Sequence, residues 1–293
     1  MTVIMLSSTI RATPFRNAYQ RLTGRGMRPA SALGHVAGRH RQVEGVATYD
    51  GLVSLPAAAE QPPSYRRYRY SVKIISHAVW LYFRFHLSLR DVEELLAERG
   101  VSEPYETIRA WCAKFGPSYA AALRRRRAHP SDKWHLDEVQ LKIKGKRHWL
   151  WRAVDRQGVV LDILVQQRRD QHAAETFLRR VINATGSEPR VVITDKLLSY
   201  LPALRRVLPN VDHRRHKGLN NRAENSHQPT RQRERLMRRF KSAEHAQGLL
   251  GLFGAVGDHF RVGRYRTAAA TRRQLLVERH STWREVVGLR VTA

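Results

Sequence analysis

Three acidic residues in a strongly basic chain have the types and positions that metal-assisted chemistry needs. Asp137 lies in the segment WHLDEV, Asp195 follows the apolar run VVIT, and Glu224 lies among arginines in NNRAENSH. Carboxylate oxygens are ligands that Mg²⁺ prefers, and a pair of such ions can stabilise both the attacking and the leaving oxygen of a phosphoryl transfer. The pattern predicts a metal site acting on phosphates, provided that the fold brings the three acids together.

Each acid also has a structural interpretation that the sequence leaves open. Glu138 is adjacent to the first acid and points to the opposite face of a strand, so periodicity does not decide which of the two enters the site. Asp195, at the end of a strand, could instead be a helix N-cap. Glu224 could form an ion pair with Arg222 or Arg231.

The acids must be positioned by an α/β sheet. From Lys133 the apolar residues alternate with period two in three segments separated by turns, which predicts a meander of antiparallel strands. A helix, a short buried strand of parallel type, a second helix and a weak strand follow, and the chain is partly helical from Asn221. The predicted segments are 133–145, 146–158, 159–169, 170–186, 189–195, 197–209 and 211–216. If the first and fourth strands are neighbours, Asp137 and Asp195 meet at one edge of the sheet.

Three helices precede the sheet. Helical periodicity extends over 72–85, 88–100 and 104–116. The second helix has Ser88 as its N-cap and Asp91 three residues later. This spacing predicts a helix-turn-helix module whose last helix enters the major groove of DNA, with an ordinary three-helix bundle as the alternative.

Two segments are expected to lie outside these elements. Residues 1–62 lack sustained periodicity and are predicted to be a disordered extension, with a small accessory domain as the alternative. Residues 123–132, LRRRRAHPSD, are predicted to be a basic linker between the helices and the sheet, in which Arg124 to Arg127 either follow DNA phosphates or form a solvated helix end.

Net charge indicates a polyanionic partner. The 293 residues contain 53 Lys and Arg against 25 Asp and Glu, a formal net charge of +28. Most of the excess is arginine, whose planar guanidinium binds phosphate through two hydrogen bonds at once, so we expect nucleic acid rather than a merely solvated basic surface. The hydrophobic share of 42% is enough for folded cores.

The cysteine count and the apolar segments exclude other classes of protein. Cys112 is the only cysteine, which excludes an internal disulfide and a cysteine-rich zinc site. The histidines show no spacing of paired metal ligands. No segment approaches the roughly 18 apolar residues of a membrane helix, so we expect a cytoplasmic protein without a membrane partner.

Four longer motifs are specific enough to compare with known proteins: YETIRAWCAKFG, WHLDEV, DRQGVVLDILVQQRRD and HKGLNNRAENSHQPTRQRERLMRRFKS. They resemble the transposases of the bacterial insertion sequence 6 family, and the resemblance extends from about Tyr65 to at least Phe260. It implies a helix-turn-helix DNA-binding region at 65–128 and a ribonuclease-H-like catalytic domain of the retroviral-integrase type at 131–265. The remaining residues, 266–293, are expected to form a C-terminal helical tail.

The resemblance also implies an activity. A DDE triad maps onto Asp137, Asp195 and Glu224, which would hold two Mg²⁺ ions, with Mn²⁺ as a substitute. Family members look like strand transferases that bind the terminal inverted repeats of their element, cut at its 3′ ends and join those ends to target DNA, typically through cointegrates. The expected partners are double-stranded DNA and further copies of the chain, as a homodimer or a higher assembly associated with the bacterial nucleoid.

Side chains expected to contact DNA come from two regions. The last helix of the module presents Thr107, Arg109 and Lys114 outward. The basic region around the third acid supplies Lys217, Arg222, Arg231, Arg235, Arg238, Arg239 and Lys241.

Two other functions remain open. A non-catalytic DNA-binding regulator that keeps a decayed transposase fold would show salt-sensitive DNA binding without cleavage or joining. A ribonuclease-H-like nuclease acting on RNA would hydrolyse its substrate without joining.

Overall fold

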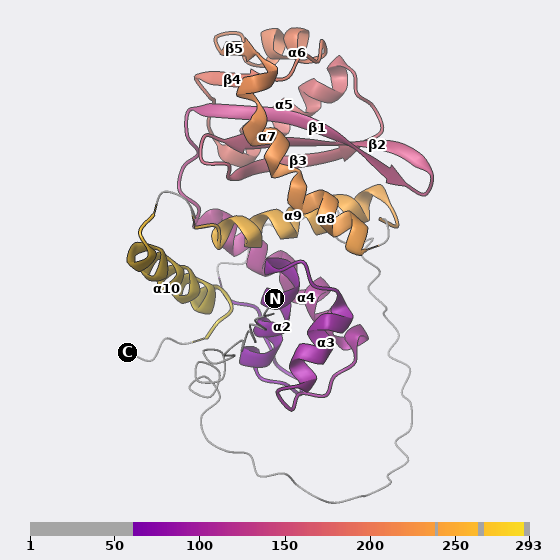
Figure 1. Cartoon of the computed structure of the whole chain (residues 1–293), viewed down its shortest axis with the longest axis vertical. Helices are drawn as coiled ribbons and strands as arrows, with labels where there is room; N and C mark the ends of the chain where they lie inside the picture. Colours follow the sequence, from indigo (N-terminus) through magenta and orange to yellow (C-terminus); the bar gives the residue numbers. More distant parts are fainter. Residues whose placement is uncertain (1–60, 238–239, 263–266, 290–293) are drawn as a thin grey trace, which may run out of the picture. The chain divides into compact units, whose positions relative to one another are not determined.

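A computed structural model describes residues 61–237, 240–262 and 267–289 (Figure 1). The predicted extension at 1–62 lies outside the described residues except for its last two positions. None of the helices in these ranges is long and apolar enough to cross a membrane.

The described chain contains a five-stranded mixed sheet. Its strands are β1 (Lys133–Ile143), β2 (Lys146–Asp155), β3 (Val160–Gln166), β4 (Val191–Thr194) and β5 (Asp212–Arg215), in the spatial order β3-β2-β1-β4-β5. The first three strands pair antiparallel, and β4 pairs parallel with β1 on one side and with β5 on the other. Three antiparallel strands followed by two parallel ones, joined by helices, confirm the predicted α/β sheet.

The hairpin between β1 and β2 turns at Lys144 and Gly145. Both residues have positive φ, 48° and 80°, as a two-residue type I′ turn requires. A tight turn fixes the register of the strands that it joins. In this register Asp137 on β1 lies directly opposite Arg152 on β2.

Helices α5 (Gln171–Thr185) and α6 (Tyr200–Val207) pack on one face of the sheet and form the crossovers to β4 and β5. α5 begins after Asp170, whose side chain accepts the Ala173 N–H, and ends at Gly186, where φ is 63°. These caps satisfy backbone groups that a helix end leaves without partners. The core on this face includes Trp134, Leu136, Trp151, Ala153, Phe177, Leu178, Tyr200 and Leu204.

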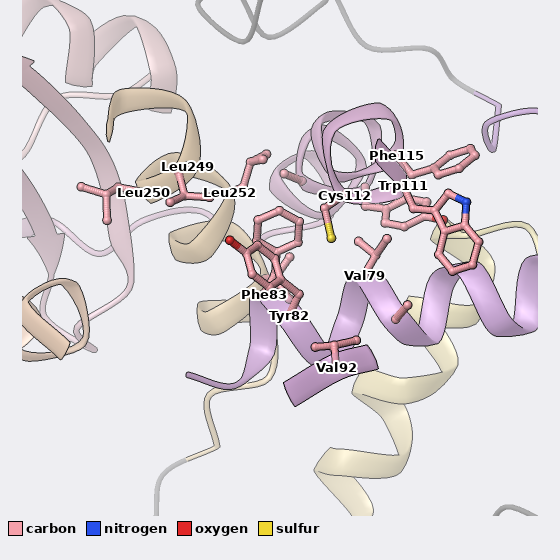
Figure 2. Close-up of a cluster of buried hydrophobic side chains, with 14 of the residues drawn as sticks. Val79, Tyr82, Phe83, Val92, Trp111, Cys112, Phe115, Leu249, Leu250 and Leu252 are labelled. Atoms are coloured by element: carbon pink, nitrogen blue, oxygen red, sulfur yellow. The ribbon is translucent and has the colours of Figure 1, made fainter. Parts of the chain in front are cut away.

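The other face of the sheet contacts α7 (Asn221–Ser226) and α9 (Ala243–His259), which are separated in the chain by α8 (Gln228–Leu236). α9 packs against β3 and also against the N-terminal helices, so a single core continues from the sheet into those helices (Figure 2). Strand residues in this core alternate with those of the first face: Val139, Leu141, Ile143, Leu150, Ile163 and Val165.

The N-terminal helices are α2 (Val72–Arg84), α3 (Leu89–Ala97) and α4 (Tyr105–Arg125), and α10 (Ala269–Val286) contacts α4. Ser88 accepts the Asp91 N–H and Asp91 accepts the Ser88 N–H, which confirms the predicted capping box. The three predicted helices are therefore confirmed as helices.

The predicted end of the third helix at residue 116 is wrong. α4 has 21 residues and continues past residue 116, through Pro117, to Arg125. The first residues of the predicted linker are therefore helical. Proline inside a helix removes one hydrogen bond, but the next turns bury Tyr119, Ala120 and Leu123. Burial of this apolar face outweighs the local helix-breaking signal, because tertiary packing supplies most of the stability of a helix.

Candidate active site

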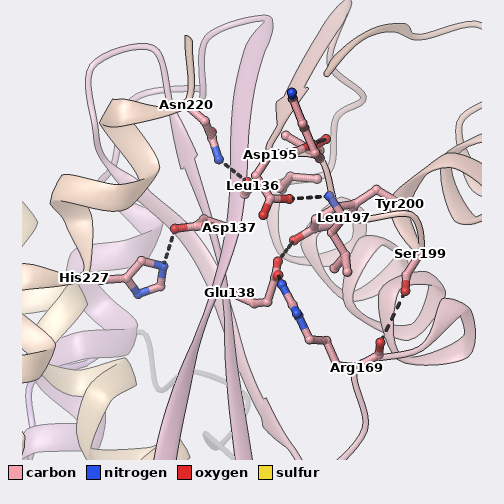
Figure 3. Close-up of polar contacts among 12 residues, drawn as sticks. Leu136, Asp137, Glu138, Arg169, Asp195, Leu197, Ser199, Tyr200, Asn220 and His227 are labelled. Atoms are coloured by element: carbon pink, nitrogen blue, oxygen red, sulfur yellow. Dashed lines mark hydrogen bonds and ion pairs between the residues drawn. The ribbon is translucent and has the colours of Figure 1, made fainter. Parts of the chain in front are cut away.

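Asp137 on β1 and Asp195, the residue directly after β4, lie side by side (Figure 3). The parallel pairing of β1 and β4 ends at His135 opposite Ile193, and each acid lies two residues beyond that pair. The predicted adjacency of the first and fourth strands is therefore confirmed. Asp195 is in an intermediate state of burial, and its Oδ1 accepts the Leu197 N–H at 2.9 Å (Figure 3).

The alternative role of Asp195 as a helix N-cap is wrong. The next helix, α6, begins at Tyr200 and has Ser199 as its N-cap residue. Asp195 closes only a local turn with Leu197, which leaves its second carboxylate oxygen free of that turn.

The carboxyl of Asp137 is held in an unfavourable environment for a charge. Its side chain is 14% exposed, and burial, followed by the charge of Asp195, raises its pKa from 3.8 to about 6. Two carboxylates placed together repel each other, and a cation between them would relieve that repulsion.

Glu138 lies on the opposite face of β1 and has structural partners there. Its side chain is fully buried, is paired with Arg169, and accepts the Tyr200 hydroxyl hydrogen at 2.9 Å. Burial outweighs the Arg169 contact and raises the pKa of Glu138 to about 7. Periodicity left open which of the two adjacent acids faces the site. Glu138 lies on the face of the sheet that α5 and α6 cover, and Asp137 lies on the face that contacts α7.

His227 is a close neighbour of Asp137 that the sequence analysis missed. Its residue surface is 3% exposed, and its Nε2 lies 3.4 Å from Oδ2 of Asp137. Burial, and then the charge of Arg152, lowers the pKa of His227 well below its ordinary value, so the imidazole is neutral and the contact is not an ion pair. Neither ring nitrogen has a hydrogen-bond partner among the described residues. The spacing of three residues from Glu224 on helical sequence was the signal that could have found it.

Glu224 lies in the first turn of α7, at the helix start that the sequence predicted. Its side chain is exposed, and neither Arg222 nor Arg231 forms an ion pair with it in the described part of the chain. α7 is tethered to β1 by Asn220, whose Nδ2 donates to the Leu136 carbonyl at 2.8 Å. Asn220 is fully buried, and it was also missed at the level of sequence.

The described residues contain no group of three His, Cys, Asp or Glu side chains that could hold a metal ion. The structure brings Asp137 and Asp195 together, but it does not gather all three predicted acids into one metal-binding group. Asp137 lies on β1 and Asp195 directly follows β4, whereas Glu224 lies on a helix of six residues. Its side chain is the only exposed one of the three.

The predicted DNA-contacting residues are mostly exposed. Arg109 and Lys114 on α4 are exposed and Thr107 is half-buried, and the Arg109 guanidinium lies 5.1 Å from the centre of the Tyr105 ring. The exposed residues of the second group are Arg222, Arg231, Arg235 and Lys241. Arg238, Arg239 and the side chain of Lys217 lie outside what the structure describes.

A basic cleft of about 1050 Å³ lies along α7 and α8. Its described lining includes Lys133, Arg156, Arg222 and Arg261, and its one acidic residue, Asp258, is paired with Arg261. Asp137, Asp195 and Glu224 do not line it. The cleft is therefore a positively charged surface beside the acidic pair rather than part of it.

Comparison with known proteins gives a consistent set of relatives. A family model described as a DDE domain, of IS240 transposase type, matches residues 131–262. The transposase for the insertion sequence-like element IS431mec of Staphylococcus aureus is 37% identical over 146 residues, which are 50% of this chain and 65% of the relative. The transposase for insertion sequence element IS257 in transposon Tn4003 of the same organism is 36% identical with the same coverage. The chain thus spans just under two thirds of the length of these relatives.

Retroviral integrases are among the solved structures with a detectable likeness. The HTLV-2 integrase catalytic core domain in complex with magnesium is 19% identical, with a TM-score of 0.29 over 33% of this chain and 66% of that one. The simian T-cell lymphotropic virus intasome in complex with PP2A regulatory subunit B56 gamma is 18% identical, with a TM-score of 0.35 over 52% of this chain and 56% of that one. Likenesses of this size carry no argument about individual residues.

Proposed function

We propose that the chain is a DDE transposase of the insertion sequence 6 family, which the DDE-domain match and the two Staphylococcus aureus relatives support, and that it catalyses DNA strand cleavage and strand transfer at the ends of an insertion sequence. The substrate is double-stranded DNA, first the terminal inverted repeats and then the target, with cointegrates as the product. The observation that carries the proposal is the pair Asp137 and Asp195, two acids on adjoining parallel strands beside a basic surface.

The three acids have separate tasks in this proposal. Asp137 and Asp195 hold divalent metal from the sheet, and Glu224 completes the set from α7. When bound, two Mg²⁺ or Mn²⁺ ions would lower the pKa of the attacking water or 3′-hydroxyl and stabilise the leaving oxygen.

The residues present fit such ions. Carboxylate oxygen is the donor that Mg²⁺ and Mn²⁺ prefer, and burial, followed by the charge of Asp195, raises the pKa of Asp137. The neutral imidazole of His227 adds no charge that would compete with a metal. Asp137 and Asp195 therefore form an unfavourable pair until a cation, or a proton, is added.

DNA would be held by the exposed arginines and lysines. Arg231 and Arg235 on α8 lie one helical turn apart, a spacing that presents both guanidinium groups on one face. Together with Arg222 and Lys133 on the cleft, they would bind phosphates near the acids. Arg109 and Lys114 on α4 would contact DNA at a second place, as the final helix of a helix-turn-helix module. Assembly as a homodimer or higher oligomer on nucleoid DNA is part of the proposal.

A strand-transfer assay with purified protein, inverted-repeat duplex and a plasmid target tests the function. Asp137→Asn removes a proposed metal ligand, whereas Glu138→Gln changes the adjacent acid on the opposite face and is the matched control. We expect Mg²⁺-dependent joining by the wild type and by Glu138→Gln, and none by Asp137→Asn. Joining by Asp137→Asn at the wild-type rate would refute the assignment of the triad.

The same assay separates the other functions. DNA binding that weakens with salt, without joining by the wild type under Mg²⁺ or Mn²⁺, would identify a non-catalytic regulator. Hydrolysis of RNA without joining of DNA would identify a nuclease.

A further inference from the structure

Arg152 is a buried arginine whose two hydrogen bonds go to the helices beside the acidic site. It lies on β2 with 6% of its surface exposed. Its Nη1 donates to the carbonyl of Ser226, the last residue of α7, and its Nη2 donates to Oγ1 of Thr230 on α8. One guanidinium therefore ties both helices to the sheet at the point where they meet.

The register of the sheet places this arginine beside the acids. Arg152 lies directly opposite Asp137 in the β1–β2 pairing, and Asn220 attaches the other end of α7 to the carbonyl of Leu136, the residue before Asp137. α7 has six residues, too few for a helix that is stable by itself. Its position relative to Asp137, and with it the position of Glu224, depends on these two attachments.

Packing alone does not account for Arg152. Burial lowers its pKa to about 10, and its Nε has no hydrogen-bond partner among the described residues. A buried charge with an unpaired donor is a costly way to fill a core, and apolar residues of similar size often replace such groups without loss of stability. A residue that costs stability at a site of chemistry is expected to serve that chemistry.

We propose that Arg152 is a positioning residue for strand transfer, which holds the α7–α8 junction on β2 so that Glu224 stays on the side of the sheet that Asp137 faces. This inference rests on the proposed function for its effect on rate. Its structural part, the attachment of α7, is independent of any activity.

Two variants remove the attachment to different degrees. Arg152→Met removes both hydrogen bonds while filling a similar volume. Thr230→Val removes one acceptor and keeps the shape of the side chain, so it remains informative if Arg152→Met does not fold. Arg124→Met is the matched control, because Arg124 is partly buried and donates to a backbone carbonyl, that of Gly251, away from α7.

The first readout is hydrogen exchange of the metal-free protein. In Arg152→Met, amide protons of residues 223–226 should exchange at least about tenfold faster than in the wild type, while strand β1 keeps its protection. Arg124→Met should leave the exchange of 223–226 unchanged. Wild-type protection of α7 in Arg152→Met and in Thr230→Val would overturn the attachment, whether or not the protein is a transposase.

The second readout is kinetic. We expect the single-turnover rate of strand transfer to fall about 100-fold in Arg152→Met, since a displacement of about 1 Å at a catalytic group can cost that much, and about tenfold in Thr230→Val. The Kd for inverted-repeat DNA should stay within about threefold of wild type, because Arg152 borders the basic cleft but is 6% exposed and both its Nη groups already donate to Ser226 and Thr230. Faster exchange of α7 with an unchanged rate would overturn the positioning role, and a wild type that never joins DNA would refute the proposed function instead.

Discussion

Asp137→Asn removes a carboxylate that the fold holds in an unfavourable place. Burial, and then the charge of Asp195, raises the pKa of Asp137. In the folded metal-free protein the ionised carboxylate therefore costs free energy, relative to the unfolded chain in which it is fully solvated. Asparagine carries no charge. We expect the variant to be more stable than the wild type in the absence of metal, although strand transfer is abolished.

The size of the gain follows from the pKa. A pKa change of one corresponds to 1.36 kcal/mol, so a rise from 3.8 to about 6 corresponds to about 3 kcal/mol. Relaxation and partial solvation of a side chain that is 14% exposed reduce this, and we expect a gain of about 2 kcal/mol in the free energy of unfolding. For a protein of this size, that corresponds to a rise in Tm of roughly 4–8 °C.

The gain has a defined dependence on pH. A carboxyl with a raised folded pKa binds its proton more tightly in the folded state, so its contribution to stability is complete below about pH 4 and is lost as the pH rises through about 6. The difference between Asp137→Asn and the wild type should accordingly grow across this window and be constant above it. Urea unfolding in EDTA at several pH values measures the difference.

Two results would refute this reasoning. One is a stability difference that does not change with pH, and the other is a variant less stable than the wild type at pH 8. Asp195→Asn is the matched control for the charge, because it removes the repulsion and leaves the burial of Asp137 unchanged. In an Asp195→Asn background, the pH window of the Asp137→Asn effect should move to lower pH.

Three further variants test neighbouring parts of the structure. Glu138→Gln should retain strand transfer and lower the free energy of unfolding in urea by at most about 1 kcal/mol. The amide can still accept the hydrogen bond from Tyr200 and no longer buries a charge. A loss of joining as large as that of Asp137→Asn would move the catalytic role to the other face of β1. Glu224→Gln should change the free energy of unfolding by less than about 0.5 kcal/mol, since the side chain is exposed, yet abolish joining; a wild-type joining rate would remove Glu224 from the triad. Gly116→Ala places a Cβ 2.9 Å from Cε2 of Phe83. The cost of overpacking, about 1–3 kcal/mol, should exceed the roughly 0.5–1 kcal/mol gained in helix propensity, so thermal melting should show a lower Tm. An unchanged or higher Tm would contradict the tight contact between α4 and α2.

Local signals predicted most elements of the fold correctly. The meander followed from period-two alternation and from the turn at Gly145, and α3 followed from the capping box of Ser88 and Asp91. These features depend on residues close together in the chain, whose conformations are decided by local sterics and hydrogen bonds. The end of α4 was predicted wrongly, because the Gly116–Pro117 pair reads as a helix end whereas the burial of Leu123 is a property of distant partners.

The acidic residues divide in the same way. The sequence by itself determined that Asp137 and Glu138 point to opposite faces of a strand, because alternation is a property of the strand alone. Only the tertiary structure decided what each face contacts. On one face, Arg169, just before α5, and Tyr200 on α6 contact Glu138. On the other face, His227 contacts Asp137.

His227 and Arg152 show why local sequence patterns could not predict all the neighbours of Asp137. Arg152 is next to Asp137 because of a strand register, and His227 is next to it because α7 packs across β1 and β2. Both relations join segments that are far apart in the chain, and the three-residue spacing of His227 from Glu224 gives only a weak local signal for one of them. Sequence determined the acids, the strands and helices that bear them and the basic charge around them, since these follow from residue type and local conformation. Tertiary structure decided which acid faces α7 and which side chains hold that helix, because those depend on contacts between segments that meet only in the folded chain.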